Sequence, residues 1–244
     1  MDSDPSLIPV VPIPFEHGLT HFAQSLTGGQ AKIVAIGSST TAGEGDIKAY
    51  PERLRSFLQD QYPNAEITMV NKGIKSQEAP IELQRFDTDV IAENPDLVIW
   101  QVGTNAVWQS PDQNPPPPSF DQTTSAIRDG LVELRKETQA DVILMDLQYV
   151  PALLTPAKKD KAIAMVEAIS ELARDAGVNV FRRFAFMKGL YQVEQASFDR
   201  MVDPTDDSRL HDSDWATNRV AWAVKLAIVG GVDKARSSVA ANIS

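Results

Sequence analysis

The sequence of 244 residues contains no cysteine and only three histidines. The absence of cysteine excludes disulfide scaffolds, thiolate nucleophiles, cysteine-ligated zinc and iron–sulfur clusters. It does not identify the compartment, because both cytosolic and exported proteins can lack cysteine. Any chemistry that needs an imidazole must use His17, His21 or His211.

Basic residues are also in short supply, with 23 Lys and Arg against 33 Asp and Glu, so the formal net charge is −10. Binding to phosphate backbones requires clustered Lys and Arg, and we therefore expect no nucleic-acid partner. Aromatic residues make up only 7%, but 43% of the residues are hydrophobic, which is typical of a globular chain. This length predicts one sizeable core.

Long apolar runs are missing, since none approaches the roughly 18 residues that a membrane span requires. We therefore expect no membrane span. Residues 1–15 are acidic and interrupted by prolines, unlike a signal peptide. The localisation stays open: periplasmic or secreted if a signal peptide was removed upstream, and cytoplasmic otherwise. The sequence does not indicate the oligomeric state.

Short, almost continuously apolar runs alternate with helical patterns along the chain. Each apolar run predicts a strand buried on both faces, and the alternation predicts an α/β fold with a five-stranded parallel sheet between helices. The predicted strands are residues 32–37, 66–71, 96–102, 141–147 and 178–181. The predicted helices are residues 50–61, 78–93, 120–138, 157–176 and 214–228.

Polar and glycine-rich segments occur where these strands end or where the last helix begins. Ligands of open parallel sheets bind at the carboxyl ends of the strands, near the point where the strand order reverses. We therefore expect these segments to form one site. They are residues 37–45 (GSSTTAGEG), 71–74 (NKGI), 103–106 (GTNA) and 206–212 (DDSRLHD).

Together these segments supply the groups that serine-based acyl transfer requires. A serine hydroxyl is a weak nucleophile and needs a base, and His211 is the candidate base for Ser39. Fixed donors must stabilise the negative oxygen of the tetrahedral intermediate, and the candidates are the N–H groups of Ser39 and Gly73 and the amide of Asn105. A carboxylate near the imidazole would orient it.

The order of these motifs resembles the SGNH/GDSL family of serine hydrolases. AIGSSTTAG resembles the serine block, with Ser38 in place of the usual aspartate, and NKGI resembles the second block. VGTNAVW resembles the third block, with Ala106 where an aspartate is common, and DDSRLHDSDW resembles the last. The residues that match the family motifs are Ser39 as nucleophile, Gly73 and Asn105 in the oxyanion hole, and His211 as base.

The resemblance implies a flavodoxin-like three-layer α/β/α sandwich and a carboxylic ester hydrolase that works without a metal or other cofactor. It implies short-chain acyl substrates, acetyl esters above all, with acetylated carbohydrates as one substrate class. Transfer of the acyl group to an alcohol remains an alternative, because water and alcohols attack the same acyl-enzyme. On this basis residues 31–232 are predicted as the catalytic domain, residues 1–30 as an arm with a short helix, and residues 233–244 as a polar tail.

The last motif departs from the family pattern. A D-x-x-H motif has its acid three residues before the histidine, where this chain has Ser208. We select Asp207 as the acid, through a one-residue bulge, and keep Asp206 or a Ser–His pair without an acid as alternatives. Trp108 and Trp215 lie near the motifs in sequence and are candidates for the substrate pocket, although packing roles are equally compatible with the sequence.

Two other functions remain open. Residues 38–43 follow the first strand, where hydroxyl and amide groups can cradle the phosphate of a flavin in a flavodoxin-like FMN-binding electron carrier. Phosphate binding gives no reason, however, for Gly73, Asn105 and His211 to occur together. A non-catalytic carbohydrate-binding module on the same fold is the second alternative.

A metal site and a lipase-type nucleophile elbow are both disfavoured. His17 and His21 lack further ligands, and the acidic run 203–214 lacks the spacing and central glycine of a calcium loop. The G-x-S-x-G pattern fails because position 41 is a threonine. Pro115 to Pro118 predict a stiff polyproline connector before the helix at 120, with a lid over the site as the less favoured alternative.

Overall fold

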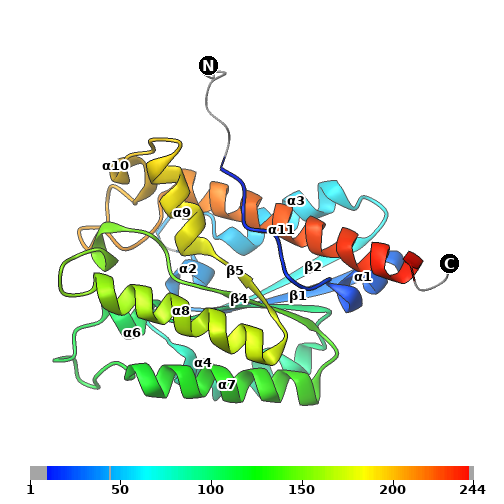
Figure 1. Cartoon of the computed structure of the whole chain (residues 1–244), viewed down its shortest axis with the longest axis horizontal. Helices are drawn as coiled ribbons and strands as arrows, with labels where there is room; N and C mark the ends of the chain where they lie inside the picture. Colours follow the sequence, from blue (N-terminus) through cyan, green and yellow to red (C-terminus); the bar gives the residue numbers. More distant parts are fainter. Residues whose placement is uncertain (1–9, 44, 242–244) are drawn as a thin grey trace.

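A five-stranded parallel sheet forms the centre of the computed structural model, which describes residues 10–43 and 45–241 (Figure 1). The strands lie in the order β2-β1-β3-β4-β5. This arrangement confirms the predicted three-layer α/β/α sandwich with a five-stranded parallel sheet. The strands are β1 (Gln30–Gly37), β2 (Glu66–Gly73), β3 (Leu97–Gln101), β4 (Asp141–Met145) and β5 (Asn179–Phe181).

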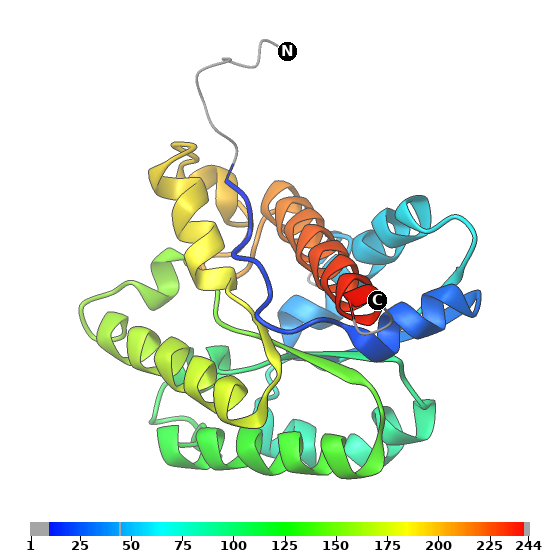
Figure 2. The same cartoon turned by 45° about the vertical axis from the view of Figure 1, so that its right-hand side comes forward.

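Helices cover both faces of the sheet (Figure 2). One layer consists of α1 (Thr20–Thr27), α3 (Tyr50–Gln61) and α11 (Asp214–Ala241). The other contains α4 (Ala79–Leu83), α7 (Phe120–Glu137) and α8 (Lys159–Ala176). The shorter elements are α2 (Ser39–Ala42), α5 (Phe86–Asp89), η1 (Ile91–Glu93), α6 (Thr104–Trp108), η2 (Pro151–Leu153), α9 (Arg183–Gln192) and α10 (Phe198–Met201).

Burial explains the apolar runs of the sequence. All five residues of β3 are buried, because helices cover both faces of this central strand. The edge strand β2 has a partly exposed pattern instead. Local signals set the helix ends: Ser119 and Gln122 form a capping box at the start of α7, and Gly177 ends α8 in the left-handed conformation at φ 67°.

The helix predicted over residues 78–93 is divided into α4, α5 and η1. The chain bends at Arg85, which has a φ of −113° and a ψ of 11°. On the two sides of this bend, Glu82 accepts a hydrogen bond from Trp100 Nε1 and Phe86 packs edge-to-face on the same indole. Residues on both sides of the bend thus contact the same buried tryptophan.

The last helix is longer than predicted. We expected it to stop near Gly230 and Gly231 and residues 233–244 to form a polar tail, but α11 continues to Ala241. Gly231 permits close packing here, because a Cβ would lie 2.8 Å from Leu19 Cγ. The Leu19 N–H also donates to the Gly231 carbonyl at 3.0 Å. The glycine serves the contact between α11 and the segment before β1, and does not terminate the helix.

The segment before β1 belongs to the same core. Phe15, Leu19 and Phe22 are all buried in the hydrophobic cluster that includes the sheet. In the part of the chain that the structure describes, no helix combines the length and apolar character needed to cross a membrane.

Candidate active site

The turn after β1 holds Ser39 at the point where the strand order reverses, between β1 and β3. Ser39 is the first residue of the short helix α2 and is almost buried, with 8% of its surface exposed. The preceding Ser38 donates from both its N–H and its hydroxyl to Gln101 Oε1, each at 3.0 Å. Because Gln101 ends β3, the neighbouring strand fixes the turn that presents the serine.

His211 lies against this serine. Its Nε2 is 3.1 Å from Ser39 Oγ, although 172 positions separate the two residues. The loop that carries His211 is closed at its base by an antiparallel bridge between Val202 and Asp212. Inside that bridge, the Asp203 N–H donates to the His211 carbonyl at 2.9 Å. The bridge thereby fixes the backbone on both sides of the imidazole.

Asp206 provides the carboxylate at the other ring nitrogen, with its Oδ2 2.9 Å from His211 Nδ1. The same oxygen accepts the N–H groups of Leu210 at 2.9 Å and His211 at 2.7 Å. The other oxygen accepts from the N–H and hydroxyl of Ser208. Burial acts to raise the pKa of Asp206, but these hydrogen bonds and the nearby imidazole outweigh it and lower the pKa to about 2.

The acid selected from the sequence therefore lies in the wrong place. Asp207 is exposed, whereas Asp206, which we kept as an alternative, is hydrogen-bonded to the imidazole. The loop turns tightly after the acid, and Arg209 has a left-handed φ of 55°. This turn brings the acid five positions before the histidine, not three, to the ring.

Two of the three predicted oxyanion donors, the Ser39 N–H and the Asn105 amide, have a hydrogen that can be donated to a substrate oxygen. Ser39 is the first residue of α2, where a backbone N–H has no partner within the helix. Asn105, 2% exposed, lies in α6 directly after β3 and donates from Nδ2 to the Gln77 carbonyl at 2.7 Å. Its amide nitrogen carries a second hydrogen that can serve a substrate oxygen.

Gly73 has a different setting. Its N–H donates to Asn71 Oδ1 at 2.9 Å, so this predicted donor already has a partner within the protein. Asn71 also donates from Nδ2 to the Thr41 carbonyl, which ties the end of β2 to α2. A Cβ at position 73 would lie 2.1 Å from Ala42 N. The glycine is therefore required for the close packing of β2 against the helix that carries Ser39.

A small hollow opens beside Ser39 and His211. Its volume is about 20 Å³, which is room for one group the size of a water molecule. Neither Trp108 nor Trp215 lines it. The remaining lining residues are Thr40, Gly43, Ile47, Ala49, Asp212 and Thr217.

The two tryptophans make other contacts. The carbonyl of Trp108 accepts from Lys158 Nζ at 2.6 Å, and that ammonium lies 5.9 Å from the centre of the indole. Trp215 lies in the first turn of α11 against the guanidinium groups of Arg200 and Arg219, at 4.3 and 5.5 Å from its centre. A role for either ring in substrate binding stays a prediction.

A buried polar network, which sequence reasoning missed, lies beneath the His211 loop. The Arg183 guanidinium donates to the Asp146 carbonyl at 3.0 Å and to Gln148 Oε1 at 2.7 Å. Gln148 in turn donates to the Leu210 carbonyl. Burial raises the pKa of Asp146 to about 7 and that of Asp212 to about 6, and Arg183 opposes both shifts. Nothing in the sequence pattern distinguishes these residues from surface charges.

The described residues include no group of three or more His, Asp and Glu side chains arranged to hold a metal ion. Outside the His211 site, the His21 ring is paired with Asp96, 3.2 Å from Nε2 to Oδ1. The His17 N–H donates to Asn179 Oδ1. The contacts of these two histidines thus lie at the start of β3 and β5, away from the site at Ser39.

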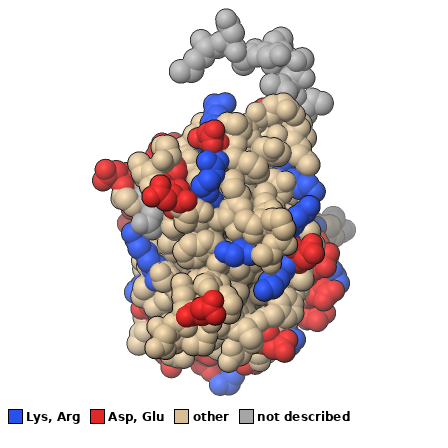
Figure 3. All heavy atoms as spheres, turned by 90° about the vertical axis from the view of Figure 1, so that its left-hand side faces the viewer, with Lys and Arg blue, Asp and Glu red and all other residues tan. Residues whose placement is uncertain are grey.

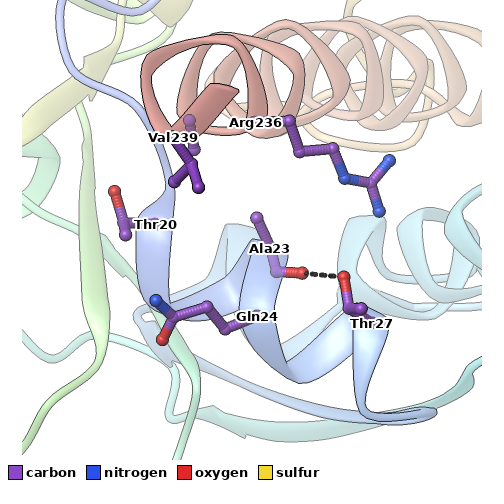
Figure 4. A pocket seen from close by; sticks show the side chains of 7 residues that line it. Thr20, Ala23, Gln24, Thr27, Arg236 and Val239 are labelled. Carbon is purple, nitrogen blue, oxygen red and sulfur yellow. Dashed lines mark hydrogen bonds between the residues drawn. The ribbon is translucent and has the colours of Figure 1, made fainter. Parts of the chain in front are cut away.

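Figure 3 faces the side of α6 and α10, where acidic and basic side chains are scattered with uncharged surface between them. A separate, mostly apolar hollow of about 330 Å³ lies between α1 and the end of α11 (Figure 4). Its lining includes no histidine, aspartate or glutamate that could serve as a base. Its lining residues are Thr20, Ala23, Gln24, Thr27, Ala235, Arg236 and Val239.

A serine, histidine and aspartate joined by hydrogen bonds at the switch point of a parallel sheet are characteristic of the serine hydrolases. The family model of the non-GDSL lipase-like family matches residues 8–234. The chain belongs to this family. The expected membership of the SGNH/GDSL family is therefore corrected: the chain belongs to a non-GDSL family instead. This is consistent with Ser38 in place of the motif aspartate.

Similar proteins include an acetylxylan esterase of Geobacillus stearothermophilus, 35% identical over 96 residues. That match covers 35% of this chain and 44% of the relative, so the chain spans less than half of that relative's length. The solved structure of Axe2, an acetylxylan esterase from the same organism, has a TM-score of 0.67 at 24% identity and covers 81% of this chain and 94% of that one.

Another similar structure is LAE5, an alpha/beta hydrolase enzyme from the metagenome of Lake Arreo, Spain. It has a TM-score of 0.67 at 18% identity and covers 84% of this chain and 96% of its own. At these identities the two solved structures establish the shared fold. Neither the flavin-binding nor the non-catalytic alternative finds support in these comparisons.

Proposed function

We propose that this protein is a serine esterase that removes short acyl groups, acetyl above all, from acetylated carbohydrates. The observation that carries the proposal is the unbroken chain of hydrogen bonds from Ser39 Oγ through His211 to Asp206. In this arrangement the imidazole can take the serine proton while the carboxylate stabilises the imidazolium that forms.

The reaction proceeds in two steps. Ser39 Oγ attacks the ester carbonyl, its proton passes to His211 Nε2, and the negative oxygen is stabilised by the Ser39 N–H and the Asn105 amide. The proton then goes to the leaving alcohol as the acyl-enzyme forms. Water attacks the acyl-enzyme with His211 again as base, and release of the carboxylic acid restores the serine.

The size of the hollow beside Ser39 supports the short acyl chain. Its volume of about 20 Å³ suits a methyl group, because a methyl group and a water molecule are similar in size. An acyl chain longer than acetyl that enters this hollow would meet Ile47 or Ala49, which line it. The acetylxylan esterase among the relatives supports both acetyl and a carbohydrate as the two halves of the substrate.

The serine and histidine are tested together with a fluorophosphonate probe and peptide mapping. We expect the adduct on Ser39, and we expect Ser39→Ala and His211→Ala to lose labelling and ester hydrolysis while their thermal unfolding stays cooperative. Ser56→Ala changes an exposed serine of α3 and serves as the matched control. Wild-type turnover in Ser39→Ala would end the proposal.

The substrate is tested with a series of aryl esters and with acetylated xylo-oligosaccharides. We expect kcat/KM to fall steeply from acetate to butyrate and octanoate, and acetate to be released from the oligosaccharide. Equal rates for acetate and octanoate would refute the short-acyl assignment. A chain that cleaves aryl acetate and leaves the acetylated sugar intact would refute the carbohydrate assignment alone.

A further inference from the structure

Glu78 is a buried carboxylate that the proposed reaction does not use. It is 3% exposed and directly precedes α4. This segment lies beside the turn that carries Asn105. Its Oε1 accepts from the Gly103 N–H at 2.8 Å and from the Ala79 N–H at 2.9 Å. Its Oε2 accepts from the N–H groups of Asn105 at 2.9 Å and Ala106 at 3.1 Å.

These bonds supply partners that α6 itself lacks. The first N–H groups of a helix have no acceptor within it, and in α6 they lie at a buried position. The buried carboxylate of Glu78 accepts hydrogen bonds from three of the four N–H groups between Gly103 and Ala106. It thereby fixes the backbone of Asn105. Leaving such buried groups without acceptors is unfavourable, because each loses its hydration without gaining a partner.

The residue before Glu78 fixes the side chain of the same asparagine. The Gln77 carbonyl accepts from Asn105 Nδ2 at 2.7 Å, and one position earlier the Ser76 carbonyl accepts from Gln109 Nε2 at 3.3 Å. Backbone and amide of Asn105 are thus held by adjacent residues of one segment. The second amide hydrogen is left with a defined direction.

We infer that Glu78 is a positioning residue that orients Asn105 as an oxyanion donor, an inference that rests on the proposed ester hydrolysis. Preorganised donors stabilise a developing oxyanion because they need no reorganisation during the reaction. The carboxylate touches neither substrate nor serine, and its whole effect passes through the turn that bears Asn105.

The decisive variant is Glu78→Gln, which keeps the size of the side chain but places an amide NH2 against backbone N–H groups. We expect kcat to fall on the order of 10-fold, within the coupling range of contacting groups, with KM changed less than about 2-fold. Glu82→Gln is the matched control. Glu82 lies in α4, four positions after Glu78, and is fully buried, but it accepts from Trp100 Nε1 and not from the backbone of the Asn105 turn.

A double-mutant cycle separates positioning from simple structural support. If Glu78 acts through Asn105, Glu78→Gln has little further effect on kcat in an Asn105→Ala background. An undiminished loss in that background, wild-type kcat in Glu78→Gln, or an equal loss in Glu82→Gln would each overturn the inference. If Glu78→Gln does not fold cooperatively, Glu78→Asp goes through the same cycle with the same criteria.

The two proposals can fail separately. Ser39-dependent hydrolysis together with an unaffected Glu78→Gln variant removes the positioning role and leaves the esterase. Hydrolysis that does not depend on Ser39 removes both proposals, because no oxyanion then forms at Ser39 for Asn105 to stabilise.

Discussion

Asp206 and His211 are five positions apart in one loop, and the carboxylate oxygen of the first lies 2.9 Å from the ring Nδ1 of the second. The acid is also held by two backbone N–H groups and by Ser208. Its position relative to the imidazole is therefore set by hydrogen bonds within the loop. The serine, in contrast, is set by β1 and by Gln101 of β3.

Asp206→Asn should reduce kcat by about 10³–10⁴, the scale of losing the acid of a Ser–His–Asp triad, because the imidazole loses its tautomer control and its counter-charge. The measurement is steady-state hydrolysis of an aryl acetate. Asp207→Asn is the control at the adjacent, exposed position and should retain wild-type kcat. A larger loss in Asp207→Asn than in Asp206→Asn would reverse the assignment.

Asn105→Ala should lower kcat by about 10²–10³, as expected when one oxyanion donor is removed, and should leave KM nearly unchanged. The same substitution at Asn218, an exposed residue of α11, should have no effect on turnover. The comparison uses kcat and KM measured on one acetyl ester. A rise in KM at constant kcat would assign Asn105 to ground-state binding instead.

Gly73→Ala should destabilise the fold by about 1–3 kcal/mol, because the new methyl group meets the α2 backbone. The matched control is Gly230→Ala in α11, where a Cβ has open space. This substitution should raise the free energy of unfolding by up to about 1 kcal/mol. Urea unfolding monitored by tryptophan fluorescence gives both values. Equal stability of the two variants would contradict the close packing of β2 against α2.

Asp146→Asn should flatten the dependence of stability on pH. The pKa of Asp146 is raised to about 7 in the folded protein, mainly by burial, so between about pH 4 and 7 the unfolded chain is ionised there and the folded chain is not. This group therefore makes stability fall as pH rises through that window and has no further effect above it. Asp212, raised to about 6, acts with the same sign.

The measurement is thermal unfolding at pH 4.5 and pH 7.5. Wild type should lose more stability between these values than Asp146→Asn, in which the amide oxygen can still accept the Phe184 N–H that bonds Asp146 Oδ1. Asp207→Asn, a change of the same chemical type at an exposed position, should keep the wild-type pH dependence. Parallel curves for wild type and Asp146→Asn would contradict the prediction.

Much of the fold follows from sequence periodicity. The apolar runs located all five strands, because burial on both faces demands continuous apolar residues. The serine and histidine were also predicted as a pair, because Ser39 follows the first strand and both residues lie in motifs that resemble those of one hydrolase family. Short helices such as α2 and α6 were not predictable, because they depend on contacts with other segments.

The misassigned acid and the extended last helix have physical causes that lie outside local sequence. Spacing alone could not select Asp206, because the distance between acid and base depends on the left-handed turn at Arg209. From the sequence alone Gly231 indicates the end of a helix, whereas in the structure it allows Leu19 to pack closely against α11. Glu78 and Arg183 resemble surface charges in sequence, and only the tertiary structure buries them.

The contact between Leu19 and Gly231 also bears on how far this chain can be shortened. α11 begins three residues after His211, and its distal half is fastened to the segment that precedes β1. A truncated version starting at residue 31 would expose the apolar face of α11 and release the far end of the helix that follows His211. The smallest autonomous folding unit of this protein therefore includes residues well upstream of its first strand.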